Sequence, residues 1–352
     1  MAGGSNMELL HSNFPPLKTN NKSFADAFDD LLFESDTIRI ATGYVTADSI
    51  AELQRILQLN SKPKVDLIIG MHYFDGFTRK EYQASLDFGH FLREKQMGGV
   101  FLSTAFKYHG KIYSFLKDES PIASIVGSNN LSSITEYSRV YETSLLFQDK
   151  KKSLELNDFI NGLIRVSKPI EACTISKYRE YNKLLADHEG VESVDPIEVV
   201  NLSLTKTKFK IPLKAGDSHS KSNLNVFFGK GREDKRGLVK PRHWYEIELI
   251  VPSEITSQKG YPGVENEDSI FDVITDDGWK FKCKVSGDYN KNLRSEGDLK
   301  ILGKWIKGRL ENYGSLNVGD LVTEEVLKKY GRSDFDIVKT NIDNLWYLNF
   351  GV

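Results

Sequence analysis

A His-x-Lys triplet, His109-Gly110-Lys111, opens an apolar run that alternates like a β-strand as far as Leu116. Side chains two residues apart on a strand point to the same face, so the imidazole and the ammonium can converge on one ligand. Imidazole ionises near neutrality and can attack phosphorus or pass a proton, whereas a Lys ammonium is a compact charge suited to a phosphate oxygen. The triplet therefore has the chemistry of half a phosphodiesterase site.

Two further polar groups stand next to apolar runs later in the chain. The run 122–126 leads into Gly127-Ser128-Asn129-Asn130, where glycine lets backbone approach a ligand and hydroxyl and amide groups donate to phosphate oxygens. Glu142 belongs to the next apolar run, and its carboxylate can hold an imidazole in one tautomer. The candidate catalytic residues are His109, Lys111, Ser128, Asn130 and Glu142, with Asn129 as an alternative phosphate ligand to Asn130.

A second triplet, His219-Ser220-Lys221, lies in a polar stretch. It has no strand around it and none of the groups that follow the first triplet. We interpret it as a solvated surface pair.

Residues 109 to 142 resemble the His-Lys-Asp motif of the phospholipase D-like superfamily. The resemblance implies an α/β catalytic domain with a mixed sheet flanked by helices, in which His109 is the nucleophile. Lys111, Ser128 and Asn130, with Asn129 as an alternative to Asn130, would then bind phosphate. The chain departs from the motif at Leu116, where the family has Asp five residues after the Lys. The nearest acid is Asp118, whose role the sequence leaves open, and the gap to Gly127 is longer than in the family.

The elements around the motif alternate between helix and strand. Helical spacing of apolar residues predicts helices over 24–33, 48–59, 79–97 and 152–166, and apolar or alternating runs predict strands over 37–45, 65–70, 100–102 and 143–147. Such sheets place ligands at the carboxyl ends of strands. We therefore predict an α/β domain over 7–167, preceded by a cloning scar over 1–6, and the resemblance implies that this domain is a phospholipase D-like nuclease.

The pattern changes after a polar connector over 168–200, which contains a predicted exposed helix over 175–188. Short apolar runs separated by Gly, Asn and Asp predict a mainly-β second domain over 201–352. Its predicted strands are 244–251, 270–274, 279–285, 299–306, 320–327, 335–339 and 346–350. Residues 244–249 and 319–340 resemble the pseudobarrel DNA-binding domain of plant transcription factors of the B-three type.

Charge in this second domain is segregated, although the whole chain has a formal charge of −2. The segment 206–242 has eleven Lys or Arg against three Asp or Glu, 243–278 has one against nine, and 279–309 has nine against three. The two basic segments fall where the family's arms clasp the major groove, and they mix cations with amides that can bind base edges. The candidate DNA-binding residues are Lys221, Ser222, Asn223, Asn225, Lys230, Arg232, Arg236, Arg242, Tyr289, Asn290, Lys291, Asn292, Arg294 and Lys307.

The two halves together resemble the NgoFVII-type bacterial restriction endonucleases, and double-stranded DNA is the partner that this implies. The resemblance implies a metal-independent, site-specific endonuclease without a cofactor, which works through a phosphohistidine. Two histidines are needed, one to attack and one to protonate the leaving oxygen, and the chain has one complete motif. A homodimer through the nuclease domain is therefore expected. A cognate methyltransferase is a further implied partner, and a requirement for a DNA-translocating ATPase subunit stays open.

Two other functions compete with this interpretation. One is a DNA-binding regulator whose nuclease-like domain only dimerises, which the intact set of catalytic candidates argues against. The other is a non-specific phospholipase D-like phosphodiesterase, which the charged segments of the second domain argue against. Only Cys173 and Cys283 are present, and no apolar run is long enough to span a bilayer, so a cytoplasmic protein without a membrane partner is the expectation.

Overall fold

The computed structural model describes residues 7–12, 16–135, 140–175, 178–179, 184–186, 188–263 and 269–352. The expected cloning scar over 1–6 and part of the helix expected over 175–188 lie outside the described residues. The chain forms two compact units. The first comprises Met1–Tyr181 and Lys230–Pro241, and the second comprises Asn182–Gly229 and Arg242–Val352. Within the described ranges, no helix has the length and apolar character to cross a membrane.

The first unit is built on a mixed sheet with the strand order β1-β7-β6-β5-β2-β3-β4-β8. Strands β2, β3 and β4 are parallel to one another, and the remaining neighbours pair antiparallel. The strands are β1 (Met7–His11), β2 (Thr37–Thr42), β3 (Lys64–Ile69), β4 (Gly98–Leu102), β5 (Ile112–Lys117), β6 (Ser120–Gly127), β7 (Thr143–Phe147) and β8 (Lys168–Pro169). The helices are α1 (Phe24–Glu34), α2 (Ala47–Asn60), α3 (His72–Asp75), α4 (Arg79–Glu94) and α5 (Lys150–Val166).

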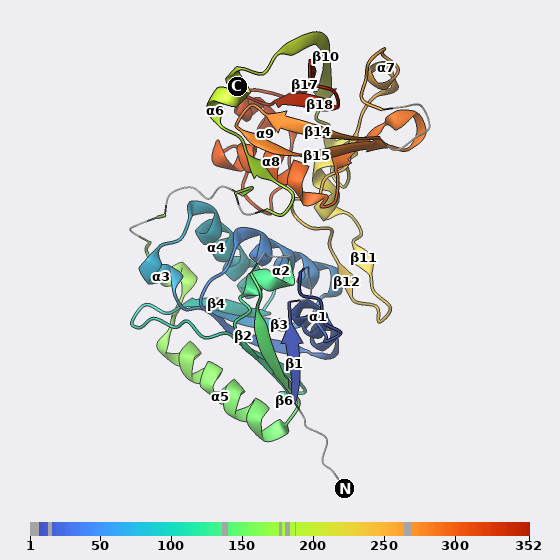
Figure 1. Ribbon diagram of the computed structural model, residues 1–352. Coiled ribbons are helices and arrows are strands. Elements are labelled where there is room, and N and C mark those ends of the chain that lie inside the picture. The colour runs from blue at the N-terminus through green and yellow to red at the C-terminus, as the bar shows by residue number, and fades with distance from the viewer. Residues whose placement is uncertain are drawn as a thin grey trace. The chain divides into compact units, whose positions relative to one another are not determined.

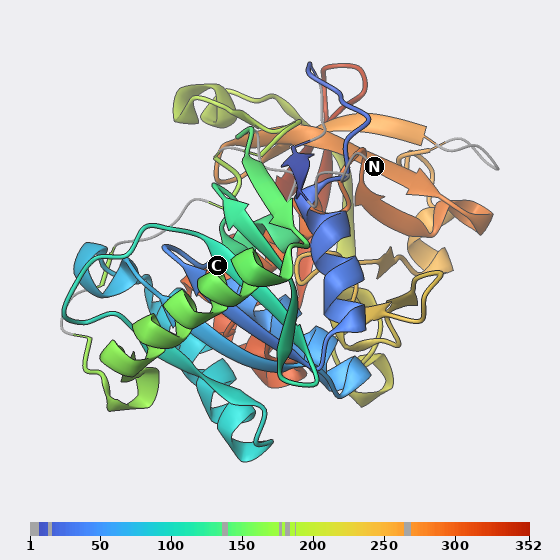
Figure 2. The same cartoon turned by 90° about the horizontal axis from the view of Figure 1, so that it is seen from below.

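Helices cover both faces of this sheet (Figure 1). Helix α5 packs Ile160 and Leu163 on Ala41, Ile68 and Ile112 of the sheet. The view from below in Figure 2 has α5 in front of the strands. On the other face, Phe28 of α1 makes edge-to-face contacts with Tyr113 and Phe115. Successive residues of β5 thus pack on opposite faces, which explains why its sequence is apolar throughout.

Polar residues fix where the helices on that second face begin. The Ser23 hydroxyl accepts a hydrogen bond from the Asp26 amide at the start of α1, and Thr78 forms a capping box with Glu81 at the start of α4. These caps satisfy amides that a helix leaves without internal partners.

Strand register brings four chain segments to one end of the sheet. Ala41 near the end of β2 lies opposite Ile112 at the start of β5, and Ile112 lies opposite Val126 near the end of β6. Gly127 in turn lies opposite Ser144 at the start of β7. The segments that follow β2 and β6 and precede β5 and β7 therefore meet at this end.

The second unit is built on a sheet with the order β10-β17-β18-β14-β15-β16-β13, with β9 paired to β15. Only β14 and β18 run parallel among these neighbours. The strands are β9 (Glu192–Ser193), β10 (Leu204–Pro212), β13 (Leu249–Ile250), β14 (Ser269–Thr275), β15 (Trp279–Ser286), β16 (Asn292–Ser295), β17 (Asp334–Thr340) and β18 (Leu345–Asn349). The helices are α6 (Pro196–Val200), α7 (Ser253–Thr256), α8 (Lys300–Asn312) and α9 (Glu324–Tyr330).

Two strands predicted in this unit are helices. The prediction for 299–306 was wrong because the buried residues Ile301, Leu302, Trp305 and Ile306 follow helical spacing, and they form the inner face of α8. The prediction for 320–327 was wrong because Thr323 caps α9, which has acids in its first turn, lysines in its last turn and Gly331 at φ 101° beyond its end. Of the strand predicted over 244–251, only β13 forms.

A hairpin of β11 (Arg232–Glu233) and β12 (Val239–Lys240) belongs to the first unit, although the chain on both sides of it belongs to the second. The Asn60 amide of α2 donates to the Val239 carbonyl at 2.8 Å and accepts from its N–H at 3.0 Å. Lys240 pairs with Asp29 at 2.9 Å, and Arg236 pairs with Asp30. Helices α1 and α2 thus hold the hairpin by its backbone and by two ion pairs.

Candidate active site

His109 and Lys111 meet at the strand ends just described. The Lys111 Nζ lies 3.3 Å from the His109 Nε2 and donates a hydrogen bond of 2.8 Å to the His109 carbonyl. The imidazole is exposed, whereas Lys111 is only 6% exposed. One nucleophilic side chain therefore faces solvent beside a cation that its own backbone holds in place.

The charge of Lys111 is set by two opposing influences. Burial lowers the pKa of its ammonium, and the nearby Glu142 carboxylate raises it. Glu142 is itself fixed through its backbone, because its N–H donates to the Ser12 hydroxyl at 2.8 Å and its carbonyl accepts from the Ser12 N–H at 3.0 Å. Glu142 thus lies near enough to act electrostatically on Lys111. The negative charge of a phosphate bound beside Lys111 would raise the pKa of the ammonium in the same way.

The two neighbouring asparagines have different surroundings. Asn129 is 5% exposed and accepts a hydrogen bond of 2.6 Å from the Ser144 hydroxyl, so its side chain is part of the sheet interior. The side-chain Oδ1 of Asn130 accepts from the Thr42 hydroxyl at 3.2 Å and from the Tyr44 N–H at 3.3 Å. With its oxygen occupied, the Asn130 amide presents its NH₂ group, which is a donor for anions.

Ser128 is exposed and continues the pairing of β6 with β7. Its hydroxyl accepts from the Thr143 N–H at 3.0 Å and lies 3.3 Å from the Thr143 carbonyl. Gly127 is required here for a reason that the sequence did not suggest. A Cβ on it would lie 2.1 Å from the Ser144 Oγ and 2.4 Å from the Thr143 carbonyl, so this glycine admits the neighbouring strand rather than a ligand.

Asp118 lies at the other end of β5 from His109. It follows Lys117 in the turn to β6, and its N–H donates to the Asp36 carboxylate at 2.7 Å. Leu116, which stands where the superfamily has Asp, is 1% exposed and part of the core. Neither residue lies with the catalytic candidates, and Asp118 has a structural partner.

Two residues that the sequence analysis did not select also contact His109. A Cβ built on Gly43 would lie 3.2 Å from the His109 Cδ2, so the backbone passes close to the imidazole. The Tyr44 ring lies edge-to-face with the His109 ring at 5.7 Å between centroids. Both residues follow the carboxyl end of β2, so the rule that ligands bind at strand ends was the available signal.

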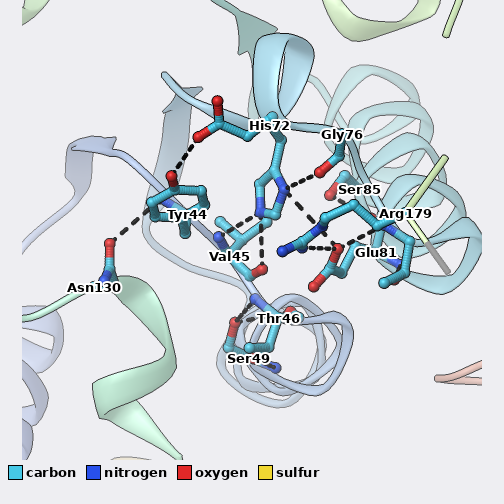
Figure 3. Close-up of polar contacts among 12 residues, drawn as sticks. Tyr44, Val45, Thr46, Ser49, His72, Gly76, Glu81, Ser85, Asn130 and Arg179 are labelled. Carbon is cyan, nitrogen blue, oxygen red and sulfur yellow. Dashed lines mark hydrogen bonds and ion pairs between the residues drawn. The ribbon is translucent and has the colours of Figure 1, made fainter. Parts of the chain in front are cut away.

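A buried histidine lies behind Tyr44, and Figure 3 shows its contacts. The His72 Nε2 accepts from the Val45 N–H at 3.0 Å, and its Nδ1 lies 3.2 Å from the Gly76 carbonyl. The Nε2 atom also lies 3.1 Å from the Val45 carbonyl, so backbone atoms surround both ring nitrogens. Burial lowers the pKa of His72, and the Glu81 carboxylate raises it. His72 therefore acts as a fixed hydrogen-bonding group that ties α3 to the segment after β2.

The predicted DNA-binding residues are dispersed over the two units. Lys230, Arg232 and Arg236 belong to the hairpin in the first unit, and the others belong to the second. Lys221, Lys230, Arg232, Arg236 and Tyr289 are exposed, and Ser222, Arg242, Lys291, Asn292 and Arg294 are half-buried. Arg242 pairs with Glu246 and Glu248, and Lys291 pairs with Asp288.

Four of these predicted residues are buried: Asn223, Asn225, Asn290 and Lys307. Asn225 forms two hydrogen bonds of 2.9 Å with the backbone of Val322. The Lys307 side chain is 0% exposed, donates to the Trp244 carbonyl at 2.5 Å and lies 4.0 Å from the centre of the Trp244 indole. Instead of facing a groove of DNA, Asn225 and Lys307 have partners inside the second unit.

Family models match both units of the chain. The NgoFVII restriction endonuclease N-terminal phospholipase D-like domain matches residues 22–177, and the NgoFVII C-terminal B3-like DNA-binding domain matches residues 199–341. The chain belongs to the NgoFVII restriction endonuclease family. The predicted fold class, an α/β phospholipase D-like domain followed by a mainly-β pseudobarrel, is thereby confirmed.

Solved structures match the chain as well, and one of them, Nuc, is described as a phospholipase D family member. NucT from Helicobacter pylori matches with 13% identity and a TM-score of 0.33 over 46% of this chain and 99% of its own. Nuc from Salmonella typhimurium matches with 13% identity and a TM-score of 0.32 over 46% of this chain and 96% of its own. A search of curated proteins found no match. Membership of the NgoFVII family makes this chain a phospholipase D-like DNA nuclease with a DNA-binding domain.

Proposed function

We propose that the protein is a metal-independent, site-specific restriction endonuclease that cleaves DNA through a phosphohistidine, at an active site shared by two copies of the chain. The observation that supports this most directly is the 3.3 Å separation between the Lys111 ammonium and the exposed His109 imidazole. A nucleophile and a positive charge are then available to one phosphodiester. The family's DNA-binding domain supports DNA as the source of that phosphodiester.

The proposed reaction has two displacements. In the first, a nitrogen of His109 forms a bond to phosphorus while the bond to one ester oxygen breaks, and that oxygen takes a proton from the partner subunit's His109. In the second, water attacks the phosphohistidine, the P–N bond breaks, and the proton of the water passes to the partner subunit's His109. The products are a free hydroxyl and a phosphate monoester, and both histidines return to their starting states.

Lys111 and Asn130 would stabilise the negative charge that develops on the phosphoryl oxygens. The Lys111 ammonium is held by the His109 carbonyl, and the Asn130 amide is held by the segment after β2, so both donors are in place before the substrate arrives. We propose Asn130 rather than Asn129 as the phosphate ligand, because the Asn129 oxygen already accepts from the Ser144 hydroxyl inside the sheet. Glu142 would favour the ammonium form of Lys111 and the imidazolium of either histidine.

The test is incubation of the protein with phage DNA in EDTA. We expect discrete fragments from the unmodified protein, no cleavage by His109→Ala, and normal cleavage by His219→Ala, in which the second triplet is altered. With end-labelled DNA and an acid-free quench, label should remain on the protein and be absent from His109→Ala. Cleavage that returns only with added Mg²⁺ would refute metal independence.

Three further outcomes would contradict other parts of the proposal. A smear in place of discrete fragments would remove site specificity. Sedimentation that finds the active species to be a monomer would remove the shared site. If His109→Ala cuts as well as the unmodified protein, the catalytic assignment itself fails.

A further inference from the structure

Tyr44 contacts the imidazoles of His109 and His72 and also Asn130, the proposed phosphate ligand. Its ring makes edge-to-face contacts with His109 at 5.7 Å and with His72 at 5.3 Å between centroids. Its backbone N–H donates to the Asn130 side chain at 3.3 Å. Figure 3 shows Tyr44 between Asn130 and His72. One half-buried residue thus contacts both the proposed nucleophile and the proposed donor to phosphate.

The position of the Tyr44 ring is fixed at its far end by a short polar chain. Its hydroxyl donates to the Asp75 carboxylate at 2.5 Å, and the Lys107 ammonium donates to the other oxygen of that carboxylate at 2.9 Å. These two hydrogen bonds lower the pKa of Asp75, so it accepts as a carboxylate. Lys107 lies two residues before His109 in the chain. Contacts therefore run from the His109 ring to Tyr44, from Tyr44 to Asp75 and from Asp75 to Lys107. Lys107 is in turn joined to the His109 backbone through residue 108.

The backbone on either side of Tyr44 is also held. His72, which is 1% exposed, accepts from the N–H of Val45. On the other side, Gly43 approaches the His109 ring so closely that an added Cβ would lie 3.2 Å from it. His109 is exposed and lies outside any strand. The contacts that Gly43 and Tyr44 make with it are therefore not ordinary core packing around a buried side chain.

We propose that Tyr44, anchored by Asp75, is a positioning residue that holds the His109 imidazole in the orientation required for attack on phosphorus. This inference rests on the proposed function. In-line displacement requires a ring nitrogen to approach along one direction, and an exposed imidazole has several rotamers. Contacts with the Tyr44 ring and with the Lys111 ammonium restrict that choice. Misplacement by about 1 Å can slow a reaction by about 100-fold.

The proposal is tested by single-turnover cleavage of phage DNA with the full-length protein in excess. The maximal rate at saturating protein measures positioning, and the concentration for half-saturation measures DNA binding. Tyr44→Leu should lower the maximal rate by about 30- to 100-fold and leave half-saturation within about twofold. Tyr44→Phe keeps the ring and should restore the rate to within about fivefold of the unmodified protein. Asp75→Ala removes both anchoring bonds and should fall between these two variants.

Tyr73→Leu is the matched control. Tyr73 is an exposed tyrosine of α3 whose ring packs against Phe74, and among the described contacts none joins its side chain to His109, Lys111 or Asn130. This variant should cleave at the rate of the unmodified protein. The proposal fails if Tyr44→Leu keeps its maximal rate, if its loss is confined to half-saturation, or if Tyr73→Leu loses as much.

Failure of this inference can be told apart from failure of the proposed function. If His109→Ala is inactive and Tyr44→Leu is as fast as the unmodified protein, only the positioning role is refuted, whereas an active His109→Ala refutes the function. If Tyr44→Leu has a lower melting temperature than the unmodified protein, Asp75→Ala becomes the test of the positioning role. Asp75 is exposed, so its replacement leaves the core unchanged. Proton NMR of the imidazole C–H groups gives a readout without activity. The His109 signal should move in Tyr44→Leu and stay in Tyr73→Leu, and a signal unmoved in both would refute the contact.

Discussion

Lys111 and Lys307 are both buried lysines, one in each unit, and their surroundings differ in one decisive respect. Burial lowers the pKa of each ammonium, and for Lys307 the pKa falls to about 7. The Lys307 ammonium ends on the Trp244 carbonyl and indole, and the side chain is fully enclosed. The Lys111 ammonium ends beside the exposed His109 imidazole. A buried lysine is thus a candidate for catalysis when its ammonium contacts a solvent-exposed group, as Lys111 does.

The largest expected effect comes from replacing each lysine by methionine, which keeps the length and removes the charge. Lys111→Met should lower single-turnover cleavage by about 1,000-fold, because a fixed donor to the developing phosphoryl charge is lost. Lys307→Met should leave cleavage within a few-fold. Urea unfolding should instead show a loss of about 1–3 kcal/mol for Lys307→Met, since the Trp244 carbonyl loses its buried donor. Equal cleavage losses in the two variants would break the comparison.

The two asparagines extend the comparison to neighbouring residues. Asn130→Ala should slow cleavage by about 100-fold and change the melting temperature little, because its NH₂ group is proposed to bind phosphate. Asn129→Ala should mainly destabilise the protein, because the buried Ser144 hydroxyl loses its acceptor. Cleavage rates and melting curves of both variants check this. The assignment is reversed if Asn129→Ala is the stable and inactive protein.

DNA affinity provides the next contrast, between Arg294 and Lys307. Arg294 of β16 is half-buried, and no other described residue forms an ion pair or hydrogen bond with its side chain. If it binds a base edge, Arg294→Ala should weaken binding to the specific site by about 1–3 kcal/mol and change binding to random DNA little. Lys307→Met should change neither affinity. Fluorescence anisotropy at several salt concentrations distinguishes these outcomes, and a fall in affinity for Lys307→Met would show that its ammonium reaches DNA.

The smallest effect is a pH dependence of stability. An unfolded lysine ionises near pH 10.4, whereas folded Lys307 does so at about 7. Between these values the unfolded chain binds a proton that the folded chain does not, so the unfolding free energy rises with pH. The protein should therefore gain about 2 kcal/mol relative to Lys307→Met between pH 7 and pH 9. Urea unfolding at both pH values measures it, and parallel changes in the two proteins would contradict the lowered pKa.

The catalytic candidates could be predicted because strand geometry acts over short distances. His109 and Lys111 are two residues apart, and Gly127 and Thr143 border neighbouring strands, so period-two alternation and antiparallel pairing were enough to bring them to one end. Tyr44 could not be selected in this way. It follows the end of β2, about 65 positions before His109, and its place at a strand end was the one indication that it lies near the site.

The basic segments show what charge counting omits. A count of Lys and Arg does not say which side chains lie inside, and on α8 the helical spacing turns Lys307 inward beside Trp305 and Ile306. The same spacing explains why 299–306 is a helix. Asn225 likewise has the amide chemistry of base recognition and uses it on the Val322 backbone. Residue type was known in each case, and tertiary packing decided its use.

The hairpin at 230–241 affects how such proteins can exchange their DNA-binding domains. Both neighbouring stretches belong to the second unit, so a gene fusion with a single junction after the first unit would bring in a foreign hairpin opposite Asn60, Asp29 and Asp30. A donor domain is compatible only if its hairpin offers a backbone pair for that asparagine and cations for those two acids. Recombination between relatives would therefore succeed most often when α1, α2 and the hairpin all come from the same parent gene, although the hairpin lies far from the two helices in the sequence.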